Sequence, residues 1–237
     1  MIKFNNISKS YGNNKVLDDV VIELVPANIN SFLGPNGSGK TTLIKIFLGL
    51  VNPNNGEVLY EGKNILKDFK FKENIGYMTQ IANFPENLTA NDLLNLITKI
   101  RKSNHVFKEE LINLFELEDS LEKKLKNLSG GTKQKVNVVV SLMFDSPIIV
   151  LDEPTVGLDP QSVYILKKFI QKEKERGKTI IMTSHIIQDV DELSDVLNIL
   201  IEGKVVYSGN KAELLTVSNS TNLEEAVINI YTKRVKC

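Results

Sequence analysis

The chain has 237 residues, of which 42% are hydrophobic, and this length suits one large globular domain or a core with an inserted lobe. Its 29 basic residues equal its 29 acidic ones, so it lacks the net positive field that would make nucleic acid an expected partner. The only cysteine is Cys237, which excludes an internal disulfide and a cysteine-ligated metal site and favours the cytosol.

Short β-branched runs alternate with helical patterns in the first and last parts of the chain. The pattern predicts strands at residues 29–33, 148–151 and 179–183, and helices at residues 41–48 and 162–172. This alternation is typical of βαβ units and a parallel sheet. The run 148–151 is apolar without alternation, which predicts a central strand covered on both faces.

The segment from residue 88 to residue 126 has a helical pattern only, with Thr89 as the expected N-cap of its first helix. The expected buried faces carry Leu93, Leu94, Ile97 and Ile100 on one helix, and Leu111, Ile112, Leu114 and Phe115 on another. We interpret this segment as part of an inserted helical lobe.

Capping and turn signals organise the rest of the chain. Asp159 can cap the helix at 162–172, with Pro160 at its first position and Gly177 at its exit. Glu202-Gly203 between two apolar runs predicts a hairpin, and a closing helix is expected at residues 223–231. The sequence thus predicts one domain made of a core (1–87 and 145–215), a helical signature lobe (88–144) and a C-terminal helix (216–237).

Neither a secretory signal nor a membrane span is expected. The first residues lack a basic segment followed by an apolar stretch. The most apolar stretch, residues 136–144, is short and is interrupted by Asn137 and Ser141. A role at a membrane therefore requires a partner protein.

Residues 34–41 match the pattern G-x-x-x-x-G-K-[ST] between an apolar strand and a helix, which is the context that this motif requires. Glycines let the backbone wrap around a phosphate, Lys40 reaches the terminal phosphates, and Thr41 offers its hydroxyl to Mg²⁺. The candidate nucleotide-binding residues are Gly34, Pro35, Asn36, Gly37, Ser38, Gly39, Lys40, Thr41 and Thr42. The loop alone does not distinguish kinases, GTPases and ATPases.

Two adjacent acids, Asp152 and Glu153, follow the apolar run 148–151, at the edge where ligands bind in open α/β sheets. One carboxylate can hold Mg²⁺ through water, while its neighbour can orient and deprotonate an attacking water. An acidic pair at a strand end is usually only the start of a loop, but the preceding phosphate loop favours a chemical role.

Three more segments come in a fixed order with His185 after them, namely Leu128-Ser-Gly-Gly-Thr-Lys-Gln134, Ile148-Ile-Val-Leu-Asp-Glu-Pro154 and Gly157-Leu-Asp159. Together with the phosphate loop, this order resembles the ABC ATPase family over nearly the whole chain. The resemblance implies an α/β fold in which a P-loop NTPase (RecA-like) core carries an antiparallel N-terminal β-subdomain and an inserted all-helical signature subdomain. It also implies that a dimer of such chains hydrolyses ATP with Mg²⁺.

The resemblance also implies roles for single residues. Tyr11 resembles the aromatic residue that stacks on adenine, Gln80 the glutamine that senses Mg²⁺ and the permease, and His185 the switch histidine that contacts the γ-phosphate. Asp152 is then the metal-associated acid, and Glu153 is the general base. Taken singly, Tyr11, Gln80 and His185 also suit structural or solvated positions, and only the order of the motifs favours the functional interpretation.

The signature segment is expected to act on the opposite chain. Ser129, Gly130 and Gly131 resemble the residues that cap the ATP held by the other subunit, and Asp159 resembles the acid that communicates across the dimer. The chain departs from the family pattern at three positions, where Thr132 replaces a usual glutamine, Lys135 a common arginine, and Val156 a frequent small polar residue. We expect Thr132 to tune the rate more than abolish it.

A narrower resemblance concerns the partners. Residues 80–87 and 157–160 resemble bacterial ATPases that pair with six-helix permeases of the ABC-2 class. Residues 79–85 and 128–137 are similar to NosF-type subunits of the copper-processing system that matures nitrous oxide reductase. This implies a NosY-type integral membrane permease, a NosD-type periplasmic protein, and a place in the cytoplasm at the inner face of the membrane.

Other functions remain open at this point. A soluble ABC ATPase without a permease, as in iron–sulfur cluster assembly, fits the motifs equally well. A DNA-repair ATPase of the same superfamily needs a long coiled coil, and translation factors need two such domains; neither pattern is present. A kinase or GTPase leaves residues 128–132 unexplained. For a transporter, Ile81 and Phe84 are the expected contacts with the permease, and Phe84 suits equally well a structural place at the base of the helical lobe.

Overall fold

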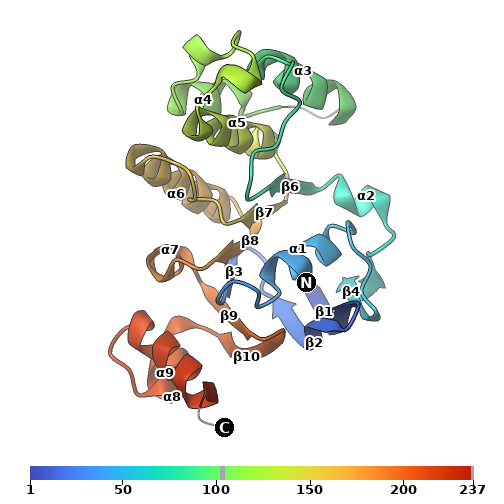
Figure 1. Ribbon diagram of the computed structural model, residues 1–237, viewed down its shortest axis with the longest axis vertical. Helices are drawn as coiled ribbons and strands as arrows, with labels where there is room; N and C mark the ends of the chain where they lie inside the picture. Colours follow the sequence, from blue (N-terminus) through green and yellow to red (C-terminus); the bar gives the residue numbers. More distant parts are fainter. Residues whose placement is uncertain (102–104, 236–237) are drawn as a thin grey trace.

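The computed structural model describes residues 1–101 and 105–235, so Cys237 lies outside the described residues (Figure 1). Its larger sheet has six strands in the order β10-β9-β3-β8-β7-β6. In chain order these strands are β3 (Ile29–Leu33), β6 (Ile75–Met78), β7 (Ile148–Asp152), β8 (Thr179–Ser184), β9 (Val196–Ile201) and β10 (Lys204–Gly209). All neighbours in this sheet pair in parallel except β9 and β10, as the alternating strand and helix patterns predicted.

The strand β7 lies inside the sheet, between β8 and the edge strand β6, and is covered on both faces. Because side chains alternate along a strand, Ile149 and Leu151 join one hydrophobic cluster, while Ile148 and Val150 join another on the opposite face. The helices α6 (Pro160–Glu175) and α7 (Ile187–Leu193) follow β7 and β8. Asp159 accepts from the Ser162 backbone N–H at 2.9 Å, which confirms it as the N-cap of α6.

The smaller sheet is antiparallel and has the order β2-β1-β4-β5. It consists of β1 (Ile2–Tyr11), β2 (Asn14–Leu24), β4 (Asn55–Tyr60) and β5 (Lys63–Asn64). This N-terminal sheet packs on the core through aromatic contacts, because the Phe4 ring lies 6.1 Å from Phe32 of β3 and 6.0 Å from Phe47 of α1 (Lys40–Phe47). A short helix, α2 (Phe69–Lys72), leads from it to β6.

The helices α3 (Ala90–Arg101), α4 (Lys108–Leu114) and α5 (Gly130–Leu142) lie together at one end of the molecule, with short 3-10 turns at Glu118–Ser120 and Leu125–Asn127 (Figure 1). Thr89 caps α3 as predicted, since its hydroxyl accepts from the Asp92 backbone at 3.0 Å. Ile100 and Leu114 were predicted to be buried, but they are 67% and 38% exposed. Both lie in the last turn of a helix, but Phe115, directly after Leu114, is 1% exposed, so the helical period alone does not tell which side of that turn is covered.

The hairpin of β9 and β10 turns through Glu202 and Gly203, both of which have positive φ, as the Glu-Gly signal predicted. Two helices follow it, α8 (Lys211–Ser218) and α9 (Leu223–Val235). The sequence interpretation missed α8, although Asn210 and Glu213 form a capping box at its start. Within the described residues, no helix is long and apolar enough to span a membrane.

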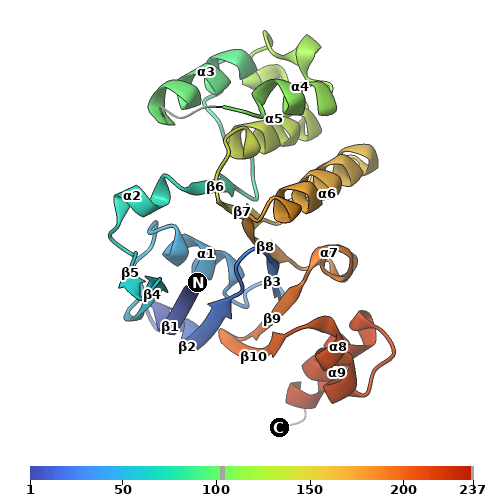
Figure 2. The same cartoon turned by 180° about the vertical axis from the view of Figure 1, so that it is seen from behind.

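Seen from behind, α6 lies between the helical lobe and α7 (Figure 2). A buried ionic cluster at its C-terminal end joins it to the sheet and the lobe. Glu173 is fully buried and pairs with Lys178 and, at 2.9 Å, with Arg176, while Lys178 also contacts Asp145 at 2.7 Å. Both cations lie over the ring of Phe107, which precedes α4.

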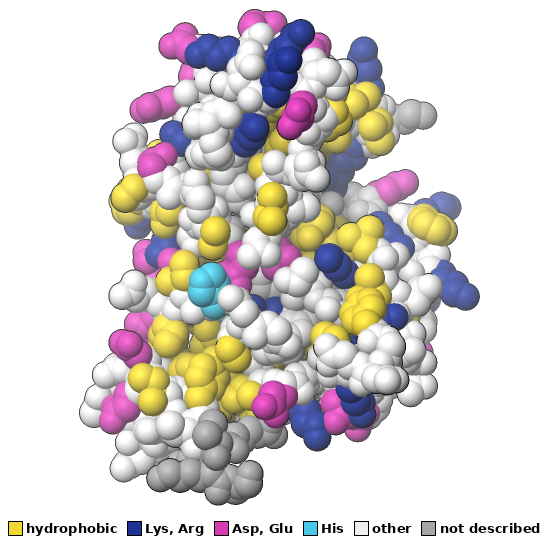
Figure 3. All heavy atoms as spheres, in the orientation of Figure 1, with side chains coloured by type: hydrophobic (Ala, Val, Ile, Leu, Met, Phe, Trp, Pro, Cys, Tyr) yellow, Lys and Arg dark blue, Asp and Glu magenta, His cyan; other side chains and the backbone are white. Residues whose placement is uncertain are grey.

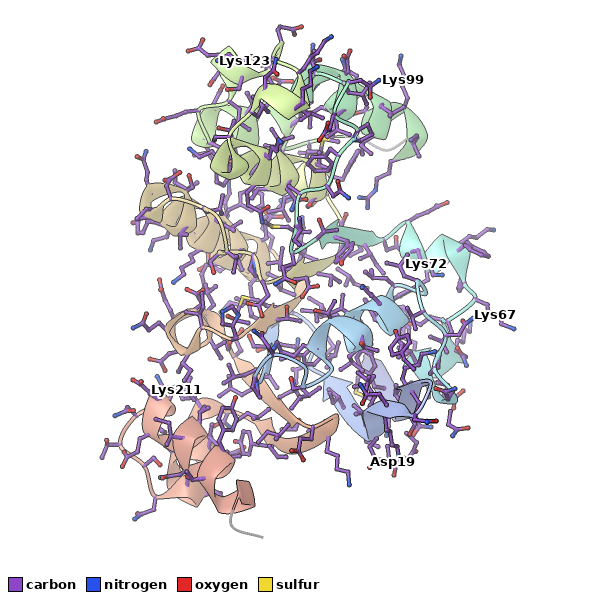
Figure 4. All side chains as sticks on the ribbon, viewed as in Figure 1. Asp19, Lys67, Lys72, Lys99, Lys123 and Lys211 are labelled. Carbon is purple, nitrogen blue, oxygen red and sulfur yellow. The ribbon has the colours of Figure 1, made fainter. Side chains whose placement is uncertain are left out.

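Basic side chains are dispersed over the surface. In Figure 4, Lys99 and Lys123 point outward from the lobe, Lys67 from the segment before α2, and Lys211 from the start of α8. The face shown in Figure 3 likewise mixes acidic and basic side chains.

Replacement of Glu173 by Gln should lower the free energy of unfolding by about 3 kcal/mol, because it leaves the buried Lys178 with an incompletely compensated charge. Urea denaturation of the whole chain measures this change. The exposed neighbour Glu175→Gln is the matched control and should change stability by less than about 0.5 kcal/mol. Equal effects of the two substitutions would show that the buried cluster does not stabilise the fold.

Candidate nucleotide-binding site

The phosphate loop connects β3 to α1 and ends at Gly39, the N-cap of α1, which has φ 103°. A Cβ on Gly39 would lie 2.6 Å from the Leu17 side chain and 2.9 Å from the Val16 carbonyl. Both the left-handed backbone and the close approach of β2 therefore require glycine here. A loop that runs into a helix N-terminus is a common place for a phosphate group to bind, because the first backbone N–H groups of the helix have no partner within the helix.

Lys40 begins α1 and is only 6% exposed. Its ammonium group donates to the Gly34 carbonyl at 2.6 Å and to the Pro35 carbonyl at 3.2 Å, and it lies 3.9 Å from Glu153 Oε1. Burial lowers the pKa of Lys40, while the negative charges of Glu153 and Asp152 act in the opposite direction. The side chain is thus a partly desolvated cation, suited to binding an anionic oxygen.

A cavity of about 250 Å³ lies beside this loop and is also lined by residues of β2, by the second residue after β6, and by the residue that follows β7. The Ser38 hydroxyl is buried there without a hydrogen-bond partner among the described residues. The lining residues are Asn14, Val16, Asn36, Gly37, Ser38, Gly39, Lys40, Thr41, Thr42, Gln80 and Glu153.

Asp152, the last residue of β7, is buried beside the loop. It accepts hydrogen bonds from the hydroxyls of Thr183 at 2.6 Å and Thr41 at 3.4 Å. Burial is the main cause that raises the pKa of Asp152, and the two hydroxyls partly oppose it. The Thr41 hydroxyl and the Asp152 carboxylate are hard oxygen donors, so the pair fits Mg²⁺.

Glu153 turns to a different set of partners because its backbone is left-handed, with φ 53°. Its Oε2 lies 2.7 Å from His185 Nδ1 and accepts the His185 backbone N–H at 3.3 Å. The carboxyl is 4% exposed and faces the cavity. The two carboxyl groups are therefore adjacent in sequence but have different partners, although the Thr183 hydroxyl that donates to Asp152 also accepts the Glu153 backbone N–H at 3.0 Å. Different partners suit a division into a metal acid and a base.

Tyr11 lies at the end of β1, is 49% exposed and does not line the cavity, although Asn14 and Val16 of the next strand do. Lys9 lies over its ring at 5.1 Å. Gln80 reaches the cavity as predicted. His185 does not line the cavity itself but contacts the carboxyl group of Glu153, which does.

The signature residues are not among those that line the cavity. Ser129 caps α5 by accepting the Thr132 backbone N–H at 3.1 Å, with Gly130 and Gly131 in the first turn of the helix. Asp159 contacts Lys135 of α5 at 3.2 Å, and the hydrogen bonds from Ser162 are the main cause that lowers the pKa of Asp159 to about 2. Within one chain, the predicted site residues therefore lie in two places, the cavity at the phosphate loop and the N-terminus of α5.

Residues 17–156 match the family model described as "ABC transporter". The chain belongs to the ABC transporter family. It is an ATP-binding subunit of that family, and its fold is that of an ABC ATPase.

Relatives and solved structures agree with the assignment of this chain to the ABC transporter family. The chain is 31% identical to the lantibiotic transport ATP-binding protein SrtF of Streptococcus pyogenes, over 99% of this chain and 100% of that protein. It is 34% identical to the bacitracin transport ATP-binding protein BcrA of Bacillus licheniformis, over 87% of this chain and 68% of that protein. A dimeric ATP-binding cassette in a post-hydrolysis state with ADP and Pi superimposes with a TM-score of 0.76 and 26% identity, covering 89% and 98% of the two chains.

Two polar residues of this ABC ATPase escaped the sequence interpretation of the site. Asn137 of α5 is 2% exposed, and its side-chain amide donates to the Thr79 carbonyl at 2.8 Å, directly before Gln80. Thr183 holds Asp152 from the neighbouring strand. Asn137 had a visible signal, because it interrupts an apolar run, whereas Thr183 could be found only from the pairing of β7 with β8.

Replacement of Asp152 by Asn should stabilise the nucleotide-free protein at pH 7. A raised carboxyl pKa means that the folded state holds the proton more tightly, so its contribution is favourable at low pH and is lost as the pH rises through the folded pKa. Asn carries no charge to desolvate, and a gain of about 1 kcal/mol corresponds to a Tm rise of about 2–4 °C.

Calorimetry at pH 7 without nucleotide measures this shift. Asp18→Asn is the control of opposite sign, because hydrogen bonds from Lys15 and Lys204 lower the pKa of Asp18. An unchanged or lower Tm for Asp152→Asn would contradict the assignment of burial as the dominant effect.

Proposed function

We propose that this chain hydrolyses ATP as part of a dimer and powers a separate membrane permease of the ABC-2 class in an exporter. The observation that carries the proposal is the contact of Glu153 with His185 and Lys40 beside the phosphate loop, while Ser129 lies outside that cavity. A base is present next to the terminal-phosphate site, but the segment that caps the nucleotide must come from a second copy.

In this proposal the loop and Lys40 bind the phosphates, and Tyr11 stacks on adenine from the end of β1. Mg²⁺, when bound through Thr41, Asp152 and Gln80, offsets the charge on the phosphate oxygens. The observed contact between Thr41 and Asp152 supports this set of donors.

Glu153 is assigned as the general base that takes the proton of the attacking water. Its contact with His185 Nδ1 at 2.7 Å orients the carboxyl group, and the ammonium group of Lys40 lies 3.9 Å from its other oxygen. His185 is 44% exposed at its side chain, so its other ring nitrogen can reach a phosphate oxygen when the dimer closes.

Two chains then close head to tail around two nucleotides, with Ser129, Gly130 and Gly131 of each chain covering the ATP of the other. Asp159, which links α6 to Lys135 on the signature helix, is placed to transmit this closure. The dimeric cassette with ADP and Pi supports the arrangement, because this chain matches 98% of that structure. Hydrolysis reopens the pair.

The permease is proposed to bind at the inner face of the membrane, close to Gln80. Ile81 is 74% exposed, whereas Phe84 packs against the main hydrophobic cluster, so Ile81 is the better candidate for contact. The cargo is proposed to be a peptide antibiotic, because SrtF and BcrA are named for lantibiotic and bacitracin transport.

The copper-processing role with a NosD-type periplasmic protein stays a prediction, and neither of these two relatives is named for it. A soluble ABC ATPase without a permease is the other alternative. Fractionation of cells separates the soluble ATPase from a transporter subunit, because only a transporter subunit is recovered with a multi-helix membrane protein.

Replacement of Glu153 by Gln should reduce ATP hydrolysis by a factor of about 10² or more, because the base is lost while the shape is kept. The same variant should form a stable dimer in ATP, which sedimentation velocity measures. Glu202→Gln in the β9–β10 turn is the control. Undiminished hydrolysis would contradict the proposed role of Glu153, and ATP binding without any dimer would contradict the proposed role of Ser129.

Replacement of Ile81 by Asp should leave hydrolysis by the purified chain unchanged and reduce its recovery with membranes several-fold, because a charge would enter the apolar contact. Immunoblotting of membrane and cytosol fractions measures this. Val217→Asp is the matched control, since Val217 is 77% exposed on α8. Equal recovery of both variants would exclude Ile81 from the contact.

A further inference from the structure

Thr132 occupies the position of the signature where the family usually has glutamine. It is the third residue of α5, and its backbone N–H donates to Ser129 Oγ at 3.1 Å. Its own hydroxyl lies 2.8 Å from the same Ser129 oxygen. A glutamine at this position would complete a capping box by reaching back to the Ser129 backbone N–H, which a threonine side chain is too short to do. The chain thus uses this position to contact the serine hydroxyl.

The number of donors and acceptors limits what the serine can do. A hydroxyl has one proton to donate and two lone pairs that accept. When Thr132 donates through both its N–H and its O–H, the two lone pairs of Ser129 are occupied and the serine proton must point away from α5. No other acceptor for the Thr132 hydroxyl is recorded among the described residues. An anion near Ser129 would accept the serine proton, so it favours the arrangement in which Thr132 donates and Ser129 accepts.

The surroundings match an incoming anion. Ser129 is exposed at the N-terminus of a helix of 13 residues, and the first turn of that helix has no acidic side chain. A chain of hydrogen bonds from Thr132 to Ser129 to an anionic oxygen is polarised in one direction, so each bond strengthens the next.

We propose that Thr132 is a positioning residue that directs the Ser129 hydroxyl proton toward a phosphate oxygen of the nucleotide bound by a second copy of this chain. The inference rests on the proposed ATP-bound dimer and deepens it. In this proposal Thr132 acts on the Ser129 hydroxyl, whereas a glutamine at the same position would contact the Ser129 backbone N–H. The expected consequence is tighter closure on ATP, seen mainly in KM and in the dimer, with a smaller change in kcat.

The test uses Thr132→Val, which keeps the shape and the capping N–H and removes only the hydroxyl, and Thr132→Ser, which restores a hydroxyl. In the Glu153→Gln chain with Mg-ATP, Thr132→Val should weaken dimerisation on the order of fivefold, because the neutral hydrogen bond that directs the Ser129 hydroxyl proton is lost. Thr132→Ser should stay within about twofold of the parent. Thr216→Val is the matched control, an exposed helical threonine whose hydroxyl donates to the Ala212 carbonyl.

A double-mutant cycle with Ser129→Ala separates positioning from a structural effect. If Thr132 acts through Ser129, Thr132→Val should add no further loss once Ser129 is alanine. Equal dimerisation of Thr132→Val and parent, or additive losses in the cycle, would overturn the inference while leaving the dimer intact. If the Glu153→Gln parent itself does not dimerise in ATP, the proposed function fails and the inference falls with it.

Discussion

The site depends on the burial of three charges at one edge of a parallel sheet. Lys40, Asp152 and Glu153 are each no more than 6% exposed. Charges can be buried only when they are paired and hydrogen-bonded, and here each partner comes from a different element. Lys40 is held by the carbonyl groups of its own loop, Asp152 by Thr183 of β8, and Glu153 by His185 after β8. The order of β3, β8 and β7 in the sheet makes these contacts possible.

The left-handed backbone of Glu153 contributes to the same set of contacts among the buried charges. Two adjacent acids at a strand end would ordinarily point to opposite faces, and a left-handed residue costs about 1 kcal/mol or more when it is not glycine. Glu153 adopts that conformation, and its carboxylate meets His185 and Lys40. The apolar strand that precedes it is fully buried and supplies the packing energy that can hold the strained turn.

The sequence predicted the parts of this site that are local. The phosphate loop, the strand at 148–152 and the cap at Asp159 follow from glycine spacing, apolar runs and capping chemistry, and the structure places them accordingly. Contacts between distant segments were not predictable in this way. The bonds from Asn137 to Thr79 and from Thr183 to Asp152 join residues far apart in the chain, and no local pattern encodes them. The exposure of Ile100, at 67%, was likewise not predictable, because it depends on which other segments pack against α3.

Direct side-chain contacts connect the phosphate-loop cavity to the signature helix α5. Asn137 ties the segment before Gln80 to α5, and Asp159 ties the start of α6 to Lys135 on the same helix. One helix therefore has the signature serine as its N-cap and contacts both the segment that follows β6 and the start of α6. In the proposed dimer, a shift of either segment would be passed to α5 and, through Ser129, to the nucleotide of the other copy. If the dimer forms as proposed, cooperation between its two sites needs no element beyond this helix and the buried polar side chains that hold it.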